Sequence, residues 1–142
     1  MASIVAICIS KIRGTKKEEI KEVELIENFG LKDDAHGGNW HRQVSLLGKE
    51  QIDDFNKRGG NVVYGDFGEN LVLEGIDLVN IKVGERLEIG ETIVEITQLG
   101  KECHSHCEIF HRVGECIMPK RGVFCIIIKG GMVTVGDKVC KV

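Results

Sequence analysis

The chain has 142 residues, of which 42% are hydrophobic and 29% charged, a composition typical of folded globular proteins and not of disordered ones. Lysine and arginine number 19 against 22 aspartates and glutamates, so there is no basic surplus for binding nucleic acid. The longest apolar run, residues 123–128, is far shorter than the roughly 20 residues of a membrane span. We therefore expect one domain over residues 1–142, located in the cytoplasm, with no nucleic-acid or membrane partner.

Short apolar stretches separated by glycine-bearing turns recur along the chain and predict a mostly β, barrel-like domain. The predicted strands cover residues 2–10, 22–27, 44–47, 70–73, 86–89, 93–97, 123–128, 133–135 and 138–142. Gly130-Gly131 and Gly136-Asp137 are predicted to form consecutive hairpin turns, where a positive φ is needed.

One or two short helices are expected. In residues 48–58 the pattern places Ile52 and Phe55 on one face, and Gly59 marks the end of the helix. The second helix is predicted over residues 104–113. The charged residues 16–22 fit either a solvated turn or a turn of helix.

The densest cluster of chemically reactive side chains lies in residues 103–116, which hold three of the six cysteines and three of the five histidines. In a reducing compartment, clustered thiols indicate a metal site or catalysis more often than disulfides. A zinc site would use Cys103, Cys107, His111 and Cys116, although their spacing is not that of a paired C-x₂-C knuckle.

The alternative is that Cys103 is a nucleophile. It follows Lys101 and precedes His104, and cationic neighbours favour the thiolate form of cysteine. Cys8, Cys125 and Cys140 lie within apolar strands, where free cysteines usually pack as small hydrophobic side chains.

Two further segments combine glycines with polar side chains. Residues 33–43 include His36 and Arg42, and this segment would suit a loop that approaches an anion, with the guanidinium binding phosphate or carboxylate. A polar turn with a satisfied Asp–His pair is an equal alternative. Residues 65–71, which include Glu69 and Asn70, fit a turn before a strand.

Taken together, these segments resemble the MOSC family, named for the C-terminal domain of molybdenum cofactor sulfurase. The resemblance runs from the first strand to the last and rests on the ordered combination of its motifs. These are Asp34-Ala35-His36-Gly37-Gly38, His41-Arg42-Gln43-Val44-Ser45-Leu46-Leu47, Gly68-Glu69-Asn70-Leu71, Val83-Gly84-Glu85-Arg86-Leu87-Glu88-Ile89-Gly90, Gly100-Lys101-Glu102-Cys103-His104 and Cys116-Ile117-Met118-Pro119.

The resemblance implies a barrel-like fold that handles the molybdenum–pterin cofactor, with Cys103 carrying sulfur as a persulfide. Lys101 and His104 would hold its thiolate. The cofactor-binding residues would be Asp34, His36, Arg42, Glu69 and Asn70. Asp33 stands where the family often has glycine.

A full sulfurase also has a pyridoxal-phosphate cysteine desulfurase domain, and 142 residues leave no room for it. We therefore expect no pyridoxal phosphate in this chain. It would receive or deliver sulfur, with a cysteine desulfurase and a molybdoenzyme as partners. Two alternatives remain open: a cofactor-binding chaperone that transfers no sulfur, and a zinc-stabilised β module that binds a partner protein.

Overall fold

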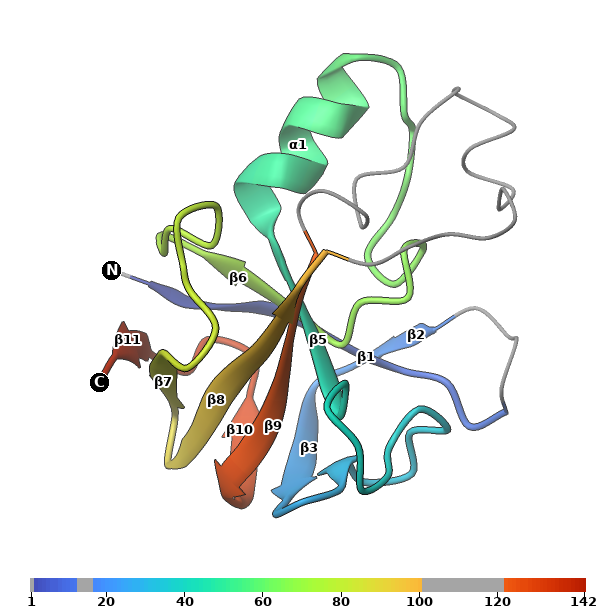
Figure 1. The fold of residues 1–142 in the computed structure, drawn as a ribbon. Coiled ribbons are helices and arrows are strands. Elements are labelled where there is room, and N and C mark those ends of the chain that lie inside the picture. The colour runs from blue at the N-terminus through green and yellow to red at the C-terminus, as the bar shows by residue number, and fades with distance from the viewer. Residues whose placement is uncertain (1, 13–16, 101–121) are drawn as a thin grey trace.

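The computed structural model describes residues 2–12, 17–100 and 122–142, and these residues form a mostly β fold (Figure 1). The strands are β1 (Ser3–Ile9), β2 (Glu18–Ile20), β3 (Glu22–Ile26), β4 (Gly30–Leu31), β5 (Val44–Gly48), β6 (Leu71–Glu74), β7 (Arg86–Ile89), β8 (Thr92–Leu99), β9 (Val123–Lys129), β10 (Gly131–Thr134) and β11 (Val139–Lys141). The helix is α1 (Lys49–Lys57). All nine predicted strands are present, with ends shifted by up to two residues.

The strands form two sheets. The larger has eight strands in the order β11-β7-β8-β9-β5-β6-β1-β2, and the smaller has the order β10-β3-β4. An isolated bridge joins Ser3, on β1 near one end of the large sheet, to Lys138, which directly precedes β11 at the other end. Within the described residues, however, no ladder joins edge strand β11 to edge strand β2, so the sheet is not closed. The mostly β prediction is therefore confirmed, and the barrel-like closure is not.

The helix α1 connects β5 to β6, which pair in parallel, whereas the other ladders are antiparallel. A parallel pair needs a crossover connection, and α1 provides it. Ile52 and Phe55 are buried as predicted, and Gly59, with φ +94°, follows the end of the helix. The predicted helix 104–113 lies outside the described residues. Among the described residues, no helix has the length and apolar character needed to cross a membrane.

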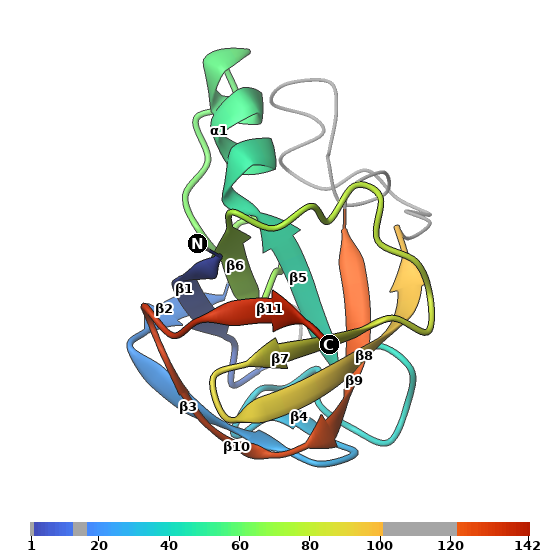
Figure 2. The same ribbon diagram turned by 90° about the vertical axis from the view of Figure 1, so that its left-hand side faces the viewer.

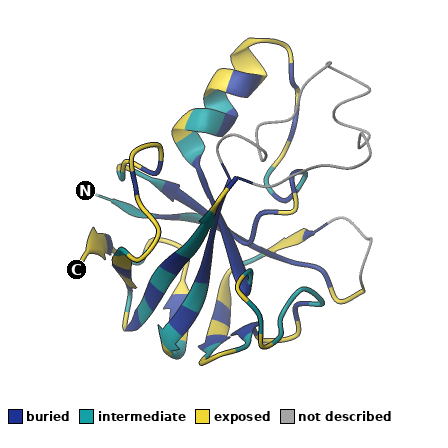
Figure 3. Ribbon diagram, viewed as in Figure 1, coloured by how far each residue is buried: buried dark blue, intermediate teal, exposed yellow. Residues whose placement is uncertain are grey.

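Side chains from the two faces of the large sheet enter two separate cores. On β9, Cys125 faces the core between the two sheets, whereas its neighbour Phe124 faces the core under α1. Leu46 and Leu47 on β5 divide in the same way, because successive side chains of a strand point to opposite faces. Strand β5 is buried along its whole length (Figure 3). Figure 2 shows the resulting layers, with α1 at one end and β3 and β10 at the other.

The hairpin prediction at Gly130-Gly131 and Gly136-Asp137 is wrong. β10 pairs with β3 in the small sheet, whereas β9 pairs with β8 and β5, and β11 with β7, in the large sheet. The chain therefore changes sheets at both glycine-bearing turns. A glycine predicts that the backbone turns, but it does not identify the strand that the next segment will pair with. Residues 18–20, within the segment left open between turn and helix, form edge strand β2.

Candidate functional site

Asn70, the residue before β6, joins three segments that are distant in the sequence. Its Nδ2 donates to Oδ2 of Asp34 at 3.1 Å and to the carbonyl oxygen of Cys8 at 3.1 Å. Its Oδ1 accepts hydrogen bonds from the backbone N–H of Ser45 at 3.0 Å and from the Ser45 hydroxyl at 3.2 Å. Asn70 and Asp34 are both buried. The amide thus fixes the start of the 34–43 loop against β1 and β5.

Asp34 is also paired with a buried cation. Lys17 Nζ lies 2.7 Å from Asp34 Oδ1, and neither side chain is more than 2% exposed. The same oxygen accepts the backbone N–H of Ser10 at 3.0 Å. Lys17 Nζ also lies 3.1 Å from Nδ1 of His36, which is part-buried. Lys17, Asp34, His36 and Asn70 therefore form one continuous polar network.

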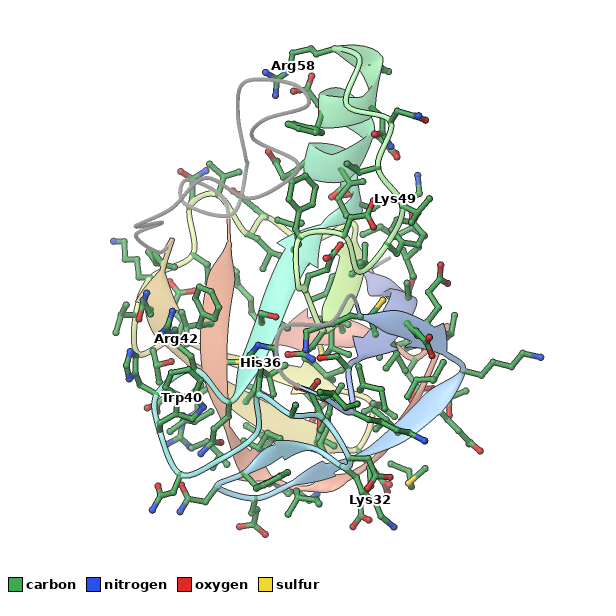
Figure 4. The ribbon with its side chains drawn as sticks, turned by 90° about the vertical axis from the view of Figure 1, so that its right-hand side faces the viewer. Lys32, His36, Trp40, Arg42, Lys49 and Arg58 are labelled. Carbon is green, nitrogen blue, oxygen red and sulfur yellow. The ribbon has the colours of Figure 1, made fainter. Side chains whose placement is uncertain are left out.

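Arg42 lies on aromatic rings at the far end of the same loop. Its guanidinium carbon is 4.7 Å from the centre of the Trp40 ring and 5.6 Å from that of Phe124, distances typical of cation–π contacts. Arg42 Nε is buried and has no hydrogen-bond partner among the described residues. Figure 4 shows Arg42 beside Trp40, with His36 nearer the middle of the molecule. The loop thus presents a cation whose charge is not neutralised by a described carboxylate.

The 34–43 loop is also tied to the end of β8. The Thr97 hydroxyl donates to the carbonyl oxygen of His41, and His41 Nε2 lies 2.8 Å from Oε1 of Gln98. Gln98 Nε2 in turn donates to the carbonyl oxygen of Gly100 at 2.8 Å, and the Gly100 N–H donates to that of Gly122 at 2.7 Å. The loop is therefore linked to the two residues that border the segment 101–121.

Glu69 is fully buried beside Asn70. Its Oε1 accepts the Phe67 N–H at 3.1 Å, whereas its Oε2 has no hydrogen-bond partner among the described residues. Burial raises the pKa of Glu69 from 4.5 to about 7, against backbone hydrogen bonds that lower it. Glu69 therefore keeps its proton to a higher pH than an exposed glutamate does.

The remaining predicted site residues lie outside the described residues. They are Lys101, Cys103 and His104 of the proposed nucleophile, together with Cys107, His111 and Cys116 of the zinc alternative. Within the part of the chain that the structure describes, no three His, Cys, Asp or Glu side chains are grouped as metal ligands would be.

The three cysteines predicted to be buried do not behave alike. Cys8 and Cys125 are buried, and burial raises the pKa of the Cys8 thiol to about 12 and that of Cys125 further. Cys140 is exposed, with Sγ 3.7 Å from Glu88 Oε1, so the prediction that it packs in the interior is wrong. β11 is an edge strand of three residues, and its residues from Cys140 onward are exposed.

Lys17 is the main site residue that the sequence did not reveal. It lies in a run of charged residues that is typical of a solvated surface, and a fully buried lysine is rare. Its partner Asp34 is 17 positions away. Trp40 gave a weak signal, because it is the single tryptophan and lies between His36 and Arg42.

A model of the MOSC domain matches residues 32–140 of the chain. Solved structures with a similar fold include the YuaD protein from Bacillus subtilis, with TM-score 0.78 and 18% identity, covering 98% of this chain and 94% of that one. YiiM from Geobacillus stearothermophilus has TM-score 0.75 and 19% identity, with coverage of 100% and 75%. YiiM from Escherichia coli has TM-score 0.67 and 19% identity, and the match covers 99% of this chain and 69% of that one. A comparison with curated proteins found no match.

Proposed function

The chain belongs to the MOSC domain family, and from this premise we propose that it binds the molybdenum–pterin cofactor in the cytoplasm and carries sulfur for it on Cys103. The proposal treats residues 1–142 as a single MOSC domain. The cofactor is the cargo of this chain, and its anionic phosphate and pterin oxygens are the groups that the protein must bind.

The observation that carries the proposal is the environment of Arg42. A buried guanidinium nitrogen that has no hydrogen-bond partner in the described part of the chain is unfavourable there, and a phosphate oxygen would satisfy it with a charge-assisted hydrogen bond. Trp40 and Phe124 hold the guanidinium through cation–π contacts at 4.7 and 5.6 Å that do not use its N–H groups as hydrogen-bond donors. The charge and chemistry of the residues present therefore fit an anionic group.

The other cofactor-binding candidates divide into two kinds. Asp34 and Asn70 are buried and bonded to protein groups, so we propose that they hold the loop in place. His36 is part-buried at the edge of this network, and we propose that it contacts the cofactor together with Arg42. Glu69 is buried, and we assign it a role in shaping the loop that leads into β6.

Sulfur would arrive by persulfide exchange. The Cys103 thiolate attacks the outer sulfur of a persulfide on a cysteine desulfurase, a new S–S bond forms on Cys103, and the desulfurase cysteine leaves as a thiolate. Lys101 and His104 are the sequence neighbours that would favour the attacking thiolate. A thiolate of a molybdoenzyme would then attack the outer sulfur in the same way, which forms a persulfide on that enzyme and releases Cys103 as a thiolate.

Mass spectrometry tests the sulfur step. The protein is incubated with a cysteine desulfurase and cysteine, and each thiol is then mapped. We expect the mass of one sulfur atom to be added at Cys103 and lost in Cys103→Ser, with Cys125→Ser as the matched control that retains it. Absence of a persulfide from Cys103 would contradict sulfur transfer.

Cofactor binding is tested separately. Trp40 is the single tryptophan and lies against Arg42, so its fluorescence reports on the proposed site. We expect the isolated cofactor to change this signal, and we expect Arg42→Met to weaken binding at least tenfold by equilibrium dialysis. The control is Arg58→Met, because Arg58 also lies on an aromatic ring, that of Phe55. Binding without a persulfide would favour the chaperone alternative, which the environment of Arg42 supports equally.

A further inference from the structure

Lys17 places an ammonium group in the interior, between the Asp34 carboxylate and the His36 ring. Its side chain is 2% exposed, with Nζ 2.7 Å from Asp34 Oδ1 and 3.1 Å from His36 Nδ1. A buried lysine of this kind remains charged when it forms a close ion pair, since each charge compensates the desolvation of the other. The contact with His36 is therefore made by an ammonium group.

The charge of Lys17 determines the direction of the hydrogen bond to His36. An ammonium group has three donors and no acceptor, so His36 Nδ1 must be the acceptor and must carry a lone pair. An imidazole with an unprotonated Nδ1 is neutral and carries its proton on Nε2. A protonated ring would direct an Nδ1–H against the ammonium group and lose this bond.

The ammonium group is itself held firmly in place. Asp34 Oδ1 accepts the Ser10 N–H, and Asp34 Oδ2 accepts the Asn70 amide, so both oxygens of the carboxylate are fixed. The carbonyl oxygen of His36 accepts the Trp40 indole N–H at 3.0 Å, which fixes the backbone that carries the ring. The ring and its charged partner are thus supported from independent directions.

We propose that Lys17 is a positioning residue that fixes His36 as a neutral imidazole protonated on Nε2. A neutral His36 adds no second positive charge beside Lys17, while Arg42 supplies the permanent charge for an anionic ligand. The inference rests on the proposed function for the ligand and on the described contacts for the protonation state. It assigns a role to a lysine that the sequence pattern placed on the surface.

The protonation state of His36 can be measured in the ligand-free, full-length protein by ¹⁵N NMR, because protonated and unprotonated ring nitrogens have well-separated shifts. Comparison with His36→Gln assigns the signals of this ring among the five histidines. At pH 7 we expect an unprotonated Nδ1 and a protonated Nε2. A proton on Nδ1, in either the neutral or the charged ring, would overturn the proposal.

A variant then tests whether Lys17 is the cause. Lys17→Met alone leaves the Asp34 carboxylate buried without its partner, so the double variant Lys17→Met/Asp34→Asn is the better choice because it removes both charges. We expect its Nδ1 shift to move toward the average of two exchanging tautomers. Lys49→Met, which breaks a more exposed Lys–Asp pair of 2.6 Å, should leave it unchanged.

A folded double variant in which the His36 shifts are unaltered would overturn the proposal. If the double variant does not fold, the spectrum of the wild-type protein still decides the protonation state of His36. Neither measurement uses the cofactor or a desulfurase. A protein with the expected His36 signals that binds no cofactor would contradict the proposed function and not the role of Lys17.

Discussion

The side-chain amide of Asn70 donates to the carboxylate of Asp34 at 3.1 Å, across 36 positions of sequence. Through this bond the residue before β6 holds the loop that carries His36 and Arg42. The two motifs in the resemblance that contain these residues are therefore parts of one buried hydrogen-bonded unit. A change in either motif should therefore also affect the stability of this hydrogen-bonded unit.

Asn70→Ala should lower the free energy of unfolding by about 3 kcal/mol, because it leaves a buried Ser45 N–H, the Cys8 carbonyl and one Asp34 oxygen without their partner. Urea denaturation measures this loss. Asn80→Ala removes an amide bonded to Asp77 on the exposed surface, and it should cost less than about 0.5 kcal/mol. Equal losses in the two variants would show that the buried network contributes little.

Glu69 should make stability fall as pH rises. Its pKa in the folded protein, about 7, lies above its ordinary 4.5, so its contribution is fully present below pH 4.5 and is lost as pH rises through 7. The loss amounts to about 3 kcal/mol at alkaline pH. Glu69→Gln should remove it, and the difference from wild type in the free energy of unfolding should grow between pH 4.5 and 7. In the control Glu24→Gln, on the exposed face of β3, the free energy of unfolding should change with pH in parallel with that of wild type. The same parallel behaviour in Glu69→Gln would refute the prediction.

Gly65 and Gly68 allow the cost of backbone conformation to be separated from that of a close contact. Both have positive φ, +95° and +81°, but a Cβ on Gly65 would lie 2.6 Å from the Lys17 carbonyl oxygen, whereas one on Gly68 meets nothing within 4 Å. Gly68→Ala should cost about 1 kcal/mol from φ alone. Gly65→Ala should cost more and should shift the His36 ring signals by displacing Lys17. Equal urea midpoints for Gly65→Ala and Gly68→Ala, together with unshifted His36 ring signals in Gly65→Ala, would contradict this prediction.

The thiols should differ in their rates of alkylation near neutral pH. Cys8 and Cys125 are buried with raised pKa values, so they should be labelled only after unfolding, whereas exposed Cys140 should be labelled in the native protein. If Cys103 is an activated thiol, peptide mapping will show it labelled faster than Cys140. Labelling of Cys103 more slowly than Cys140 would remove the chemical basis for sulfur transfer.

Nine of the strands and α1 could be predicted because each depends on a local pattern, whereas the short strands β2 and β4 were not predicted. Alternation in β3 and the spacing of Ile52 and Phe55 in α1 are visible without knowledge of the partners. Which strands pair with each other could not be predicted. β10 pairs with β3 across more than 100 positions, and the sequence of neither strand identifies its partner. The exposure of Cys140 has the same cause, since it depends on β11 being an edge strand.

Within the site, His36 and Arg42 were predicted from residue type and from the resemblance, whereas Lys17 was not. Its burial results from the Asp34 carboxylate, which the fold brings to it from a different segment. A charged side chain is expected on the surface unless its partner is known. Sequence patterns thus identified His36 and Arg42, whose residue types suggest ligand binding, and missed Lys17, whose proposed role is to position His36.

The hydrogen bond between the Gly100 N–H and the Gly122 carbonyl has a consequence for how such a protein can be altered. Leu99 and Val123 are still paired in the β8–β9 ladder, so the two strands remain paired almost to the residues that border segment 101–121. The ends between which an exchanged 101–121 segment would have to fit are therefore set by β8 and β9.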